Sequence, residues 1–151
     1  MKKILWISLV IVLVVVIPSI VLIICGRMEK VKPTDPQWGI VQSVENVTST
    51  GLTIVWDRDN PKNIVGLHTG EEYSLERKTL FGWRTVSTII QDYAINTVAY
   101  SIGVNMTSRQ EIDWKWLYGE LPKGTYRIGK TISMDVGGRI VGRYYTEFKI
   151  K

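Results

Sequence analysis

The sequence predicts an all-β domain, a sandwich of two antiparallel sheets with about seven short strands, preceded by one N-terminal transmembrane helix. From residue 38 onward, apolar side chains recur at every second position, and Gly, Pro and Asn interrupt the runs. This alternation is typical of strands that bury one face. Residues 4–24 carry no charged side chain. A helix of that length reaches about 31 Å, which is the thickness of a bilayer's hydrocarbon core.

The apolar run is longer than the roughly 7 to 15 residues of a secretory signal, so we interpret residues 1–25 as a retained anchor. Its end carries the single cysteine, Cys25, where a bacterial lipoprotein would be lipidated. That signal requires a small residue before the cysteine, and residues 22–24 are Leu, Ile and Ile. Lipoprotein attachment at Cys25 and simple cleavage are therefore the less favoured alternatives.

The charges that flank the apolar run indicate its orientation. Lys2 and Lys3 precede the run, and the positive-inside tendency places such a basic tip in the cytoplasm. Arg27, Lys30 and Lys32 on the other flank oppose this assignment. On balance, we expect a single-pass protein of the cell membrane whose C-terminal domain is extracytoplasmic.

The net charge of +5 lies mostly beside the apolar run. Residues 1–32 contain five basic side chains and one acidic one, whereas residues 33–151 contain 14 basic and 13 acidic side chains. A nearly neutral domain lacks the concentrated basic face that phosphate binding requires, which argues against nucleic acid as a partner. With no cysteine after Cys25, the domain contains no disulfide.

The domain is expected at residues 38–151, after a linker at 26–37 that Pro33 and Pro36 keep irregular. The longest irregular segment is expected at 58–70.

In the second strand, Leu52, Ile54 and Trp56 share one face, so Trp56 is a predicted core residue. The predicted strands are 39–47, 51–57, 71–78, 83–89, 98–105, 125–134 and 141–150.

The stretch "LPKGTYRI" at 121–128 resembles the tyrosine corner of immunoglobulin-like sandwiches. There, a tyrosine near the start of the penultimate strand turns its hydroxyl back to the chain a few residues upstream. Tyr126 would play that part, with Leu121 buried beneath it and Pro122 and Gly124 shaping the turn. These four residues and Trp56 are the predicted structural determinants of the domain.

Several motifs together resemble a bacterial immunoglobulin-like domain found in membrane-tethered and lipoprotein-like proteins of Firmicutes. They are "EEYSLE" followed by Trp83, then "AYSI", "DWKWLYGELPKGTYRIGK" and a closing "YYTEFKI". They follow the family order over residues 38–151, about three quarters of the chain. The resemblance implies a β-sandwich on the outer face of the membrane. It implies no activity and carries over no catalytic residue.

The residues themselves also argue against an enzyme. The only histidine, His68, falls in the predicted loop, so a serine triad or a two-histidine zinc site is hard to assemble. Carboxylates could form a pair, Asp113 with Glu120 or Glu71 with Glu72, but acids beside turns usually cap them. "DRDN" at 57–60 lacks the glycine and distal glutamate of a calcium loop. We predict no catalytic residue, no metal and no cofactor.

Trp114 and Trp116 are the candidate ligand-binding residues. In an extended segment, two residues that are two positions apart face the same side, so their rings would form a stacking platform for sugars. In a helical turn, the same two residues diverge by about 200°. The structural alternative is that one ring closes the sandwich and the other covers it. We predict a non-catalytic domain for binding, adhesion or sensing at the cell envelope. Its partner would be an envelope protein or, if the tryptophans form a platform, a wall polysaccharide.

Overall fold

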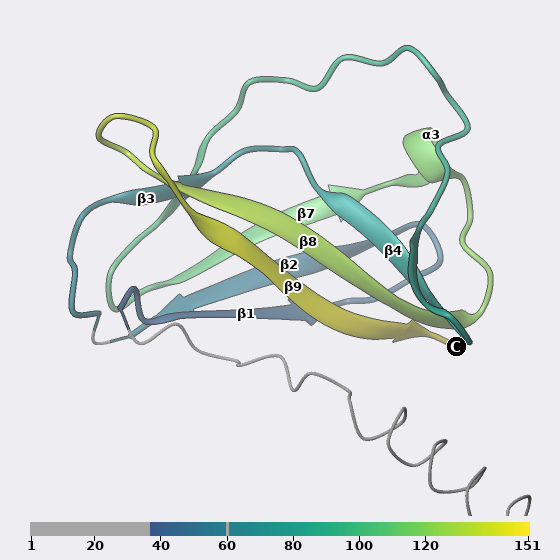
Figure 1. Cartoon of the computed structure of the whole chain (residues 1–151), viewed down its shortest axis with the longest axis horizontal. Helices are drawn as coiled ribbons and strands as arrows, with labels where there is room; N and C mark the ends of the chain where they lie inside the picture. The colour runs from purple at the N-terminus through teal and green to yellow at the C-terminus, as the bar shows by residue number, and fades with distance from the viewer. Residues whose placement is uncertain (1–36, 60) are drawn as a thin grey trace, which may run out of the picture. The chain divides into compact units, whose positions relative to one another are not determined.

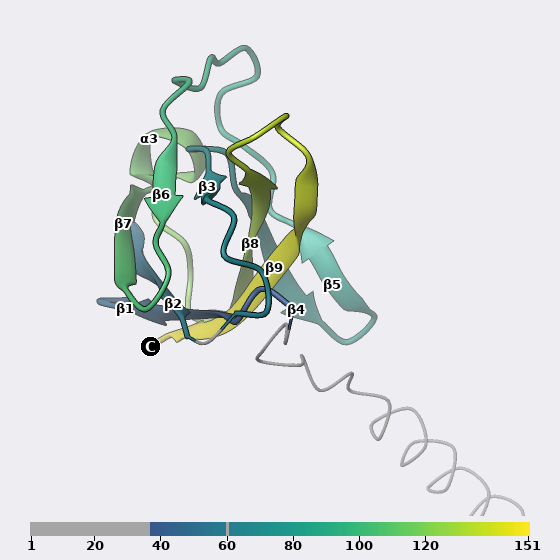
Figure 2. The same cartoon turned by 90° about the vertical axis from the view of Figure 1, so that its left-hand side faces the viewer.

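The computed structural model describes residues 37–59 and 61–151, which form two facing antiparallel sheets (Figures 1 and 2). The smaller sheet has the order β1-β2-β7 and consists of β1 (Ile40–Glu45), β2 (Gly51–Arg58) and β7 (Thr107–Asp113). In this sheet, β2 is the central strand, and its residues 52–56 are all buried. The sandwich expected from the alternation of apolar residues is therefore confirmed.

The larger sheet is organised around the long strand β8 (Gly124–Met134). One edge of β8 pairs with β9 (Ile140–Ile150), and the other edge pairs with β4 (Ser74–Thr79) and β3 (Leu67–Thr69). The sheet continues through β5 (Gly82–Thr85) beside β4 and β6 (Tyr100–Ile102) beside β3. The connection between β5 and β6 arches over the sandwich (Figure 1).

The strand prediction was wrong at two places. The described residues contain nine strands instead of about seven, because β3 lies inside the segment expected to be irregular and β7 was not predicted. Strand β3 has only three residues, and β7 has a single apolar residue, Ile112, with Gln110 at the other inward position. Both strands form because neighbouring strands provide backbone hydrogen-bond partners. The local sequence pattern does not show where those partners lie.

The predicted transmembrane helix and most of the linker lie outside the described residues. Within 37–59 and 61–151, no helix has the length and apolar character to cross a bilayer. The only helix described there is a single turn, α3 (Lys115–Tyr118).

The core between the sheets is centred on aromatic rings. Trp56 is completely buried, and its indole nitrogen donates a hydrogen bond to the side chain of Gln42 (3.2 Å). The ring of Phe148 lies between those of Trp114 and Tyr126, with centroids 5.8 Å away on each side. The Tyr126 hydroxyl donates to the Pro122 carbonyl four residues upstream (2.8 Å), which is the geometry of a tyrosine corner.

A buried arginine connects three parts of the chain. The side chain of Arg58, at the end of β2, is fully buried, and its guanidinium donates to four backbone carbonyls. They belong to Trp38 before β1, Ile102 in β6, and Asn63 and Val65 in the segment before β3, at 2.8 to 3.2 Å. The segment that lacks regular structure is therefore fixed by a side chain.

Replacement of Arg58 by alanine should lower the free energy of unfolding by about 3 kcal/mol or more, because it leaves buried carbonyls without a donor. The measurement is urea unfolding of the full chain in mild detergent, followed by tryptophan fluorescence. Arg84→Ala, at an exposed position in β5, is the control and should change stability by less than about 0.5 kcal/mol. Equal effects of the two substitutions would show that Arg58 does not hold this segment.

Candidate functional site

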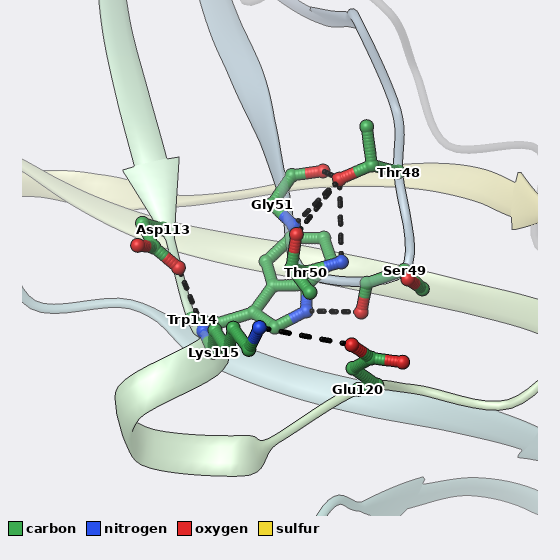
Figure 3. Close-up of polar contacts among 8 residues, drawn as sticks. All are labelled: Thr48, Ser49, Thr50, Gly51, Asp113, Trp114, Lys115 and Glu120. Atoms are coloured by element: carbon green, nitrogen blue, oxygen red, sulfur yellow. Dashed lines mark hydrogen bonds and ion pairs between the residues drawn. The ribbon is translucent and has the colours of Figure 1, made fainter.

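Trp114 immediately precedes α3 and is completely buried. Its indole nitrogen donates to the Ser49 carbonyl (2.9 Å), and its backbone nitrogen donates to the Thr50 carbonyl (2.9 Å) (Figure 3). The chain then enters a helical turn, and the Asp113 carboxylate accepts a hydrogen bond from the Lys115 backbone nitrogen (2.8 Å). Asp113 therefore satisfies a free backbone donor at the start of the turn.

The loop that receives Trp114 is shaped by Thr48. Its hydroxyl oxygen lies 3.2 Å from the Thr50 backbone nitrogen and 3.0 Å from the Gly51 backbone nitrogen, and both donate to it (Figure 3). The Ser49 carbonyl also accepts from the Leu121 backbone nitrogen (2.8 Å). One loop between β1 and β2 thus anchors both the indole and the start of the tyrosine corner.

The candidate tryptophan platform requires a correction, because the two rings do not share a face. Trp114 is buried, whereas Trp116 lies in the helical turn and is 45 % exposed. The neighbour of the Trp116 ring is Tyr93, from the connection between β5 and β6, in an edge-to-face arrangement with centroids 5.8 Å apart. Trp114 therefore offers no ring face to a ligand, and an aromatic surface here depends on Trp116 and Tyr93.

Trp116 and Tyr93 line the mouth of a cavity of about 270 Å³. It lies between β7 and α3 on one side and β6 with the segment before β4 on the other, and residues 93–96 form another wall. Its lining combines aromatic rings with carboxylates and contains no Lys, Arg or His. The rings belong to Tyr73, Tyr93, Tyr100 and Trp116, and the carboxylates belong to Glu71, Glu111 and Asp113.

Two buried oxygens in this lining have no protein hydrogen-bond partner among the described residues. They are the amide oxygen of Gln110 and the hydroxyl of Tyr73. Gln110 is only 3 % exposed, because its position in β7 faces the interior. Buried polar atoms are nearly always paired, so a cavity with two unpaired ones is suited to receive hydrogen-bonding groups of a ligand.

The electrostatics of the cavity follow from burial and from its acids. Burial raises the pKa of the Tyr73 phenol, and the nearby Tyr118 and Asp113 raise it further. Behind Glu71, the fully buried Lys130 of β8 donates from its Nζ atom to the Gly70 carbonyl. Burial lowers the pKa of Lys130 to about 8, against the opposing influence of Glu71 and Glu72.

The other residues considered from the sequence have ordinary contacts. His68 was expected in a loop but lies in β3, with its Nδ1 atom 2.9 Å from an Asp135 carboxylate oxygen. Glu120 contacts the Lys115 ammonium (3.8 Å), and Asp57 accepts a hydrogen bond from Thr107 (2.6 Å). Among the described residues, no cluster of His, Cys, Asp or Glu has a metal-binding arrangement.

Sequence reasoning missed most of the cavity. Tyr73 lay in a predicted strand but had no assigned role, and Gln110 lay in a strand that was not predicted. No local pattern pointed to Gln110, because its strand has a single apolar residue, Ile112. No signal could reveal Tyr93 either, because its place beside Trp116 depends on the path of a long connection.

A family model described as a bacterial Ig-like domain matches residues 34–149. No curated protein matches the chain.

The contrast between two tyrosines tests whether the cavity lining is selected for stability. Tyr126→Phe should lower the free energy of unfolding by about 1 kcal/mol, because it removes the hydrogen bond to Pro122. Tyr73→Phe removes a buried hydroxyl without a protein partner, so it should leave stability unchanged or raise it. Urea unfolding of the full chain in mild detergent measures both effects. A larger loss for Tyr73→Phe than for Tyr126→Phe would contradict this assignment.

Proposed function

The chain belongs to the bacterial Ig-like domain family, and from that premise we propose that it is a membrane-anchored, extracytoplasmic binding domain of the cell envelope. Membership of this family favours a non-catalytic binding module over an enzyme. The cavity beside α3 is the observation that carries the binding role, since it joins exposed rings, carboxylates and two unpaired buried oxygens. Such a combination of apolar walls and a few directed polar groups is characteristic of ligand sites.

The proposed location rests on the sequence before the domain. The uncharged run at 4–24 is long enough to span a bilayer once, and the basic tip at Lys2 and Lys3 favours a cytoplasmic N-terminus. The Ig-like domain would then lie outside, held near the membrane by a short linker. Lipid attachment at Cys25 is the alternative mode of anchoring.

Protease access in bacterial spheroplasts tests both parts of the location. External protease should remove a C-terminal tag from intact spheroplasts, while the chain stays in carbonate-washed membranes. Val14→Arg with Val16→Arg should release it, because each arginine at the centre of a span costs about 2.5 to 3.5 kcal/mol. Cys25→Ser should change nothing for a protein anchor but should release a lipid-anchored chain. A tag protected until lysis would place the domain in the cytoplasm.

A second candidate function, binding of wall carbohydrate, is favoured by the exposed ring of Trp116 beside Tyr93. Rings at the mouth of a polar cavity can stack on the apolar face of a sugar. This candidate keeps the carbohydrate hypothesis but replaces Trp114, which is buried, with Tyr93.

A pull-down of the full chain in mild detergent on isolated bacterial cell wall tests the carbohydrate function. Trp116→Ala should weaken binding about five-fold, because a lost stacking contact is worth about 1 kcal/mol. Phe81→Ala, at a residue that is 89 % exposed and outside the cavity lining, is the matched control and should bind like the wild type. Equal binding by the Trp116 variant, or no binding by the wild type, would remove this candidate and direct the search to envelope proteins.

A further inference from the structure

The cavity beside α3 contains acceptors and carboxylates but no basic side chain, and this composition restricts its ligand. Glu71, Glu111 and Asp113 line it, and Gln110 adds an amide oxygen that is buried and unpaired. An amide oxygen can only accept a hydrogen bond, so the ligand must supply a donor. Carboxylates in the same lining favour a ligand that also carries a positive charge.

The protein's own cations do not satisfy these groups. Lys130 directs its ammonium to the Gly70 carbonyl, and Lys115 lies 3.8 Å from Glu120, which is outside the lining. The positive charge of Lys130 behind Glu71 offsets part of the negative charge there, as the influence of Glu71 on the pKa of Lys130 indicates. Glu111 and Asp113, on the β7 side, have no ion pair with a basic side chain within 37–59 and 61–151.

The aromatic walls are consistent with a cationic ligand that also has a flat apolar face. Aromatic faces attract ammonium groups, and this attraction strengthens when water is excluded. At the mouth, the half-exposed Trp116 ring can cover one face of a sugar ring. A lysine side chain would bring one ammonium on a thin stem, whereas a sugar with a free amine also brings hydroxyl donors. Those donors suit the separate oxygens of Gln110 and Tyr73.

From these observations, we propose that the cavity lined by Tyr73, Gln110 and Trp116 binds an amino sugar with a free, protonated amine. This inference rests on the binding function proposed above and specifies its ligand class. The amine would face the carboxylates, the hydroxyl donors would reach the Gln110 and Tyr73 oxygens, and the sugar ring would stack on Trp116. Binding would supply hydrogen-bond donors to both buried oxygens, which have no protein partner among the described residues.

Titration calorimetry of the full chain in mild detergent, with a tetramer of β-1,4-linked glucosamine as the probe, tests this proposal. The matched ligand is the fully N-acetylated tetramer, which keeps the rings and all hydroxyls but lacks the positive charge. We expect the glucosamine tetramer to bind at least ten-fold more tightly and to weaken as salt concentration rises. Equal binding of the two tetramers, or no binding of either, would overturn the proposal. A lysine-containing peptide that binds more tightly than the glucosamine tetramer would assign the cavity to a protein partner and would also overturn it.

Two sets of variants locate the binding. Glu71→Gln, Glu111→Gln and Asp113→Asn together remove the cavity charges while keeping oxygens for the Tyr100 hydroxyl and the Lys115 nitrogen. Affinity should fall at least ten-fold. Glu45→Gln, Asp59→Asn and Glu147→Gln remove the same number and types of carboxylates outside the cavity lining and should leave affinity within two-fold. Equal losses in the two sets would indicate only general charge attraction and would contradict a site in the cavity.

Gln110→Leu separates binding from folding. It removes the unpaired oxygen at similar volume, so the melting temperature should stay the same or rise while affinity falls about ten-fold. An unchanged affinity would exclude Gln110 from the site.

Wall binding with no preference for the glucosamine tetramer would refute the ligand class while leaving the proposed carbohydrate function in place.

Discussion

The burial of Trp114 is the constraint on which the candidate site depends. Its indole stacks on Phe148 in the core and donates to the Ser49 carbonyl in the loop between β1 and β2. The backbone leaves the extended conformation at Trp114 (φ −105°, ψ 3°), and the next residues form a helical turn. The turn directs Trp116 outward, beside Tyr93 and over the cavity. The same contact thus closes one end of the sandwich and presents an aromatic ring to solvent.

Two pairs of buried polar side chains differ in how their hydrogen-bonding groups are used. Arg58 and Tyr126 direct their donors to backbone carbonyls, and each adds side-chain hydrogen bonds to the contacts that hold the chain there. Tyr73 and Gln110 are buried beside the cavity without a protein partner. Since an unpaired buried oxygen costs stability, a core selected only for folding would carry apolar side chains there. This difference separates the groups that hold the fold from those that suit a ligand.

Partly buried aromatic residues elsewhere on the domain have a different environment. The guanidinium of Arg127 lies between the rings of Trp83 and Tyr145, 4.8 and 4.4 Å from their centroids, and also pairs with the Glu76 carboxylate. A cation of the protein itself covers those rings. The resulting cation–π contacts stabilise the larger sheet, which explains why these rings are present. The rings that line the cavity stand beside carboxylates instead. Their environment leaves the role of cation to a ligand.

The sequence by itself determined the sandwich, the second strand with Trp56 inward and the turn before Tyr126, because alternation and turn residues are local properties. Strands β3 and β7 were decided by the tertiary structure, because their pairing depends on partners far along the chain. The separation of Trp114 from Trp116 was also decided there: two residues at a spacing of two can share a face or diverge, and the helical turn that begins after Trp114 makes them diverge. The cavity has the same origin, since its lining comes from five separate segments that no single stretch of sequence brings together.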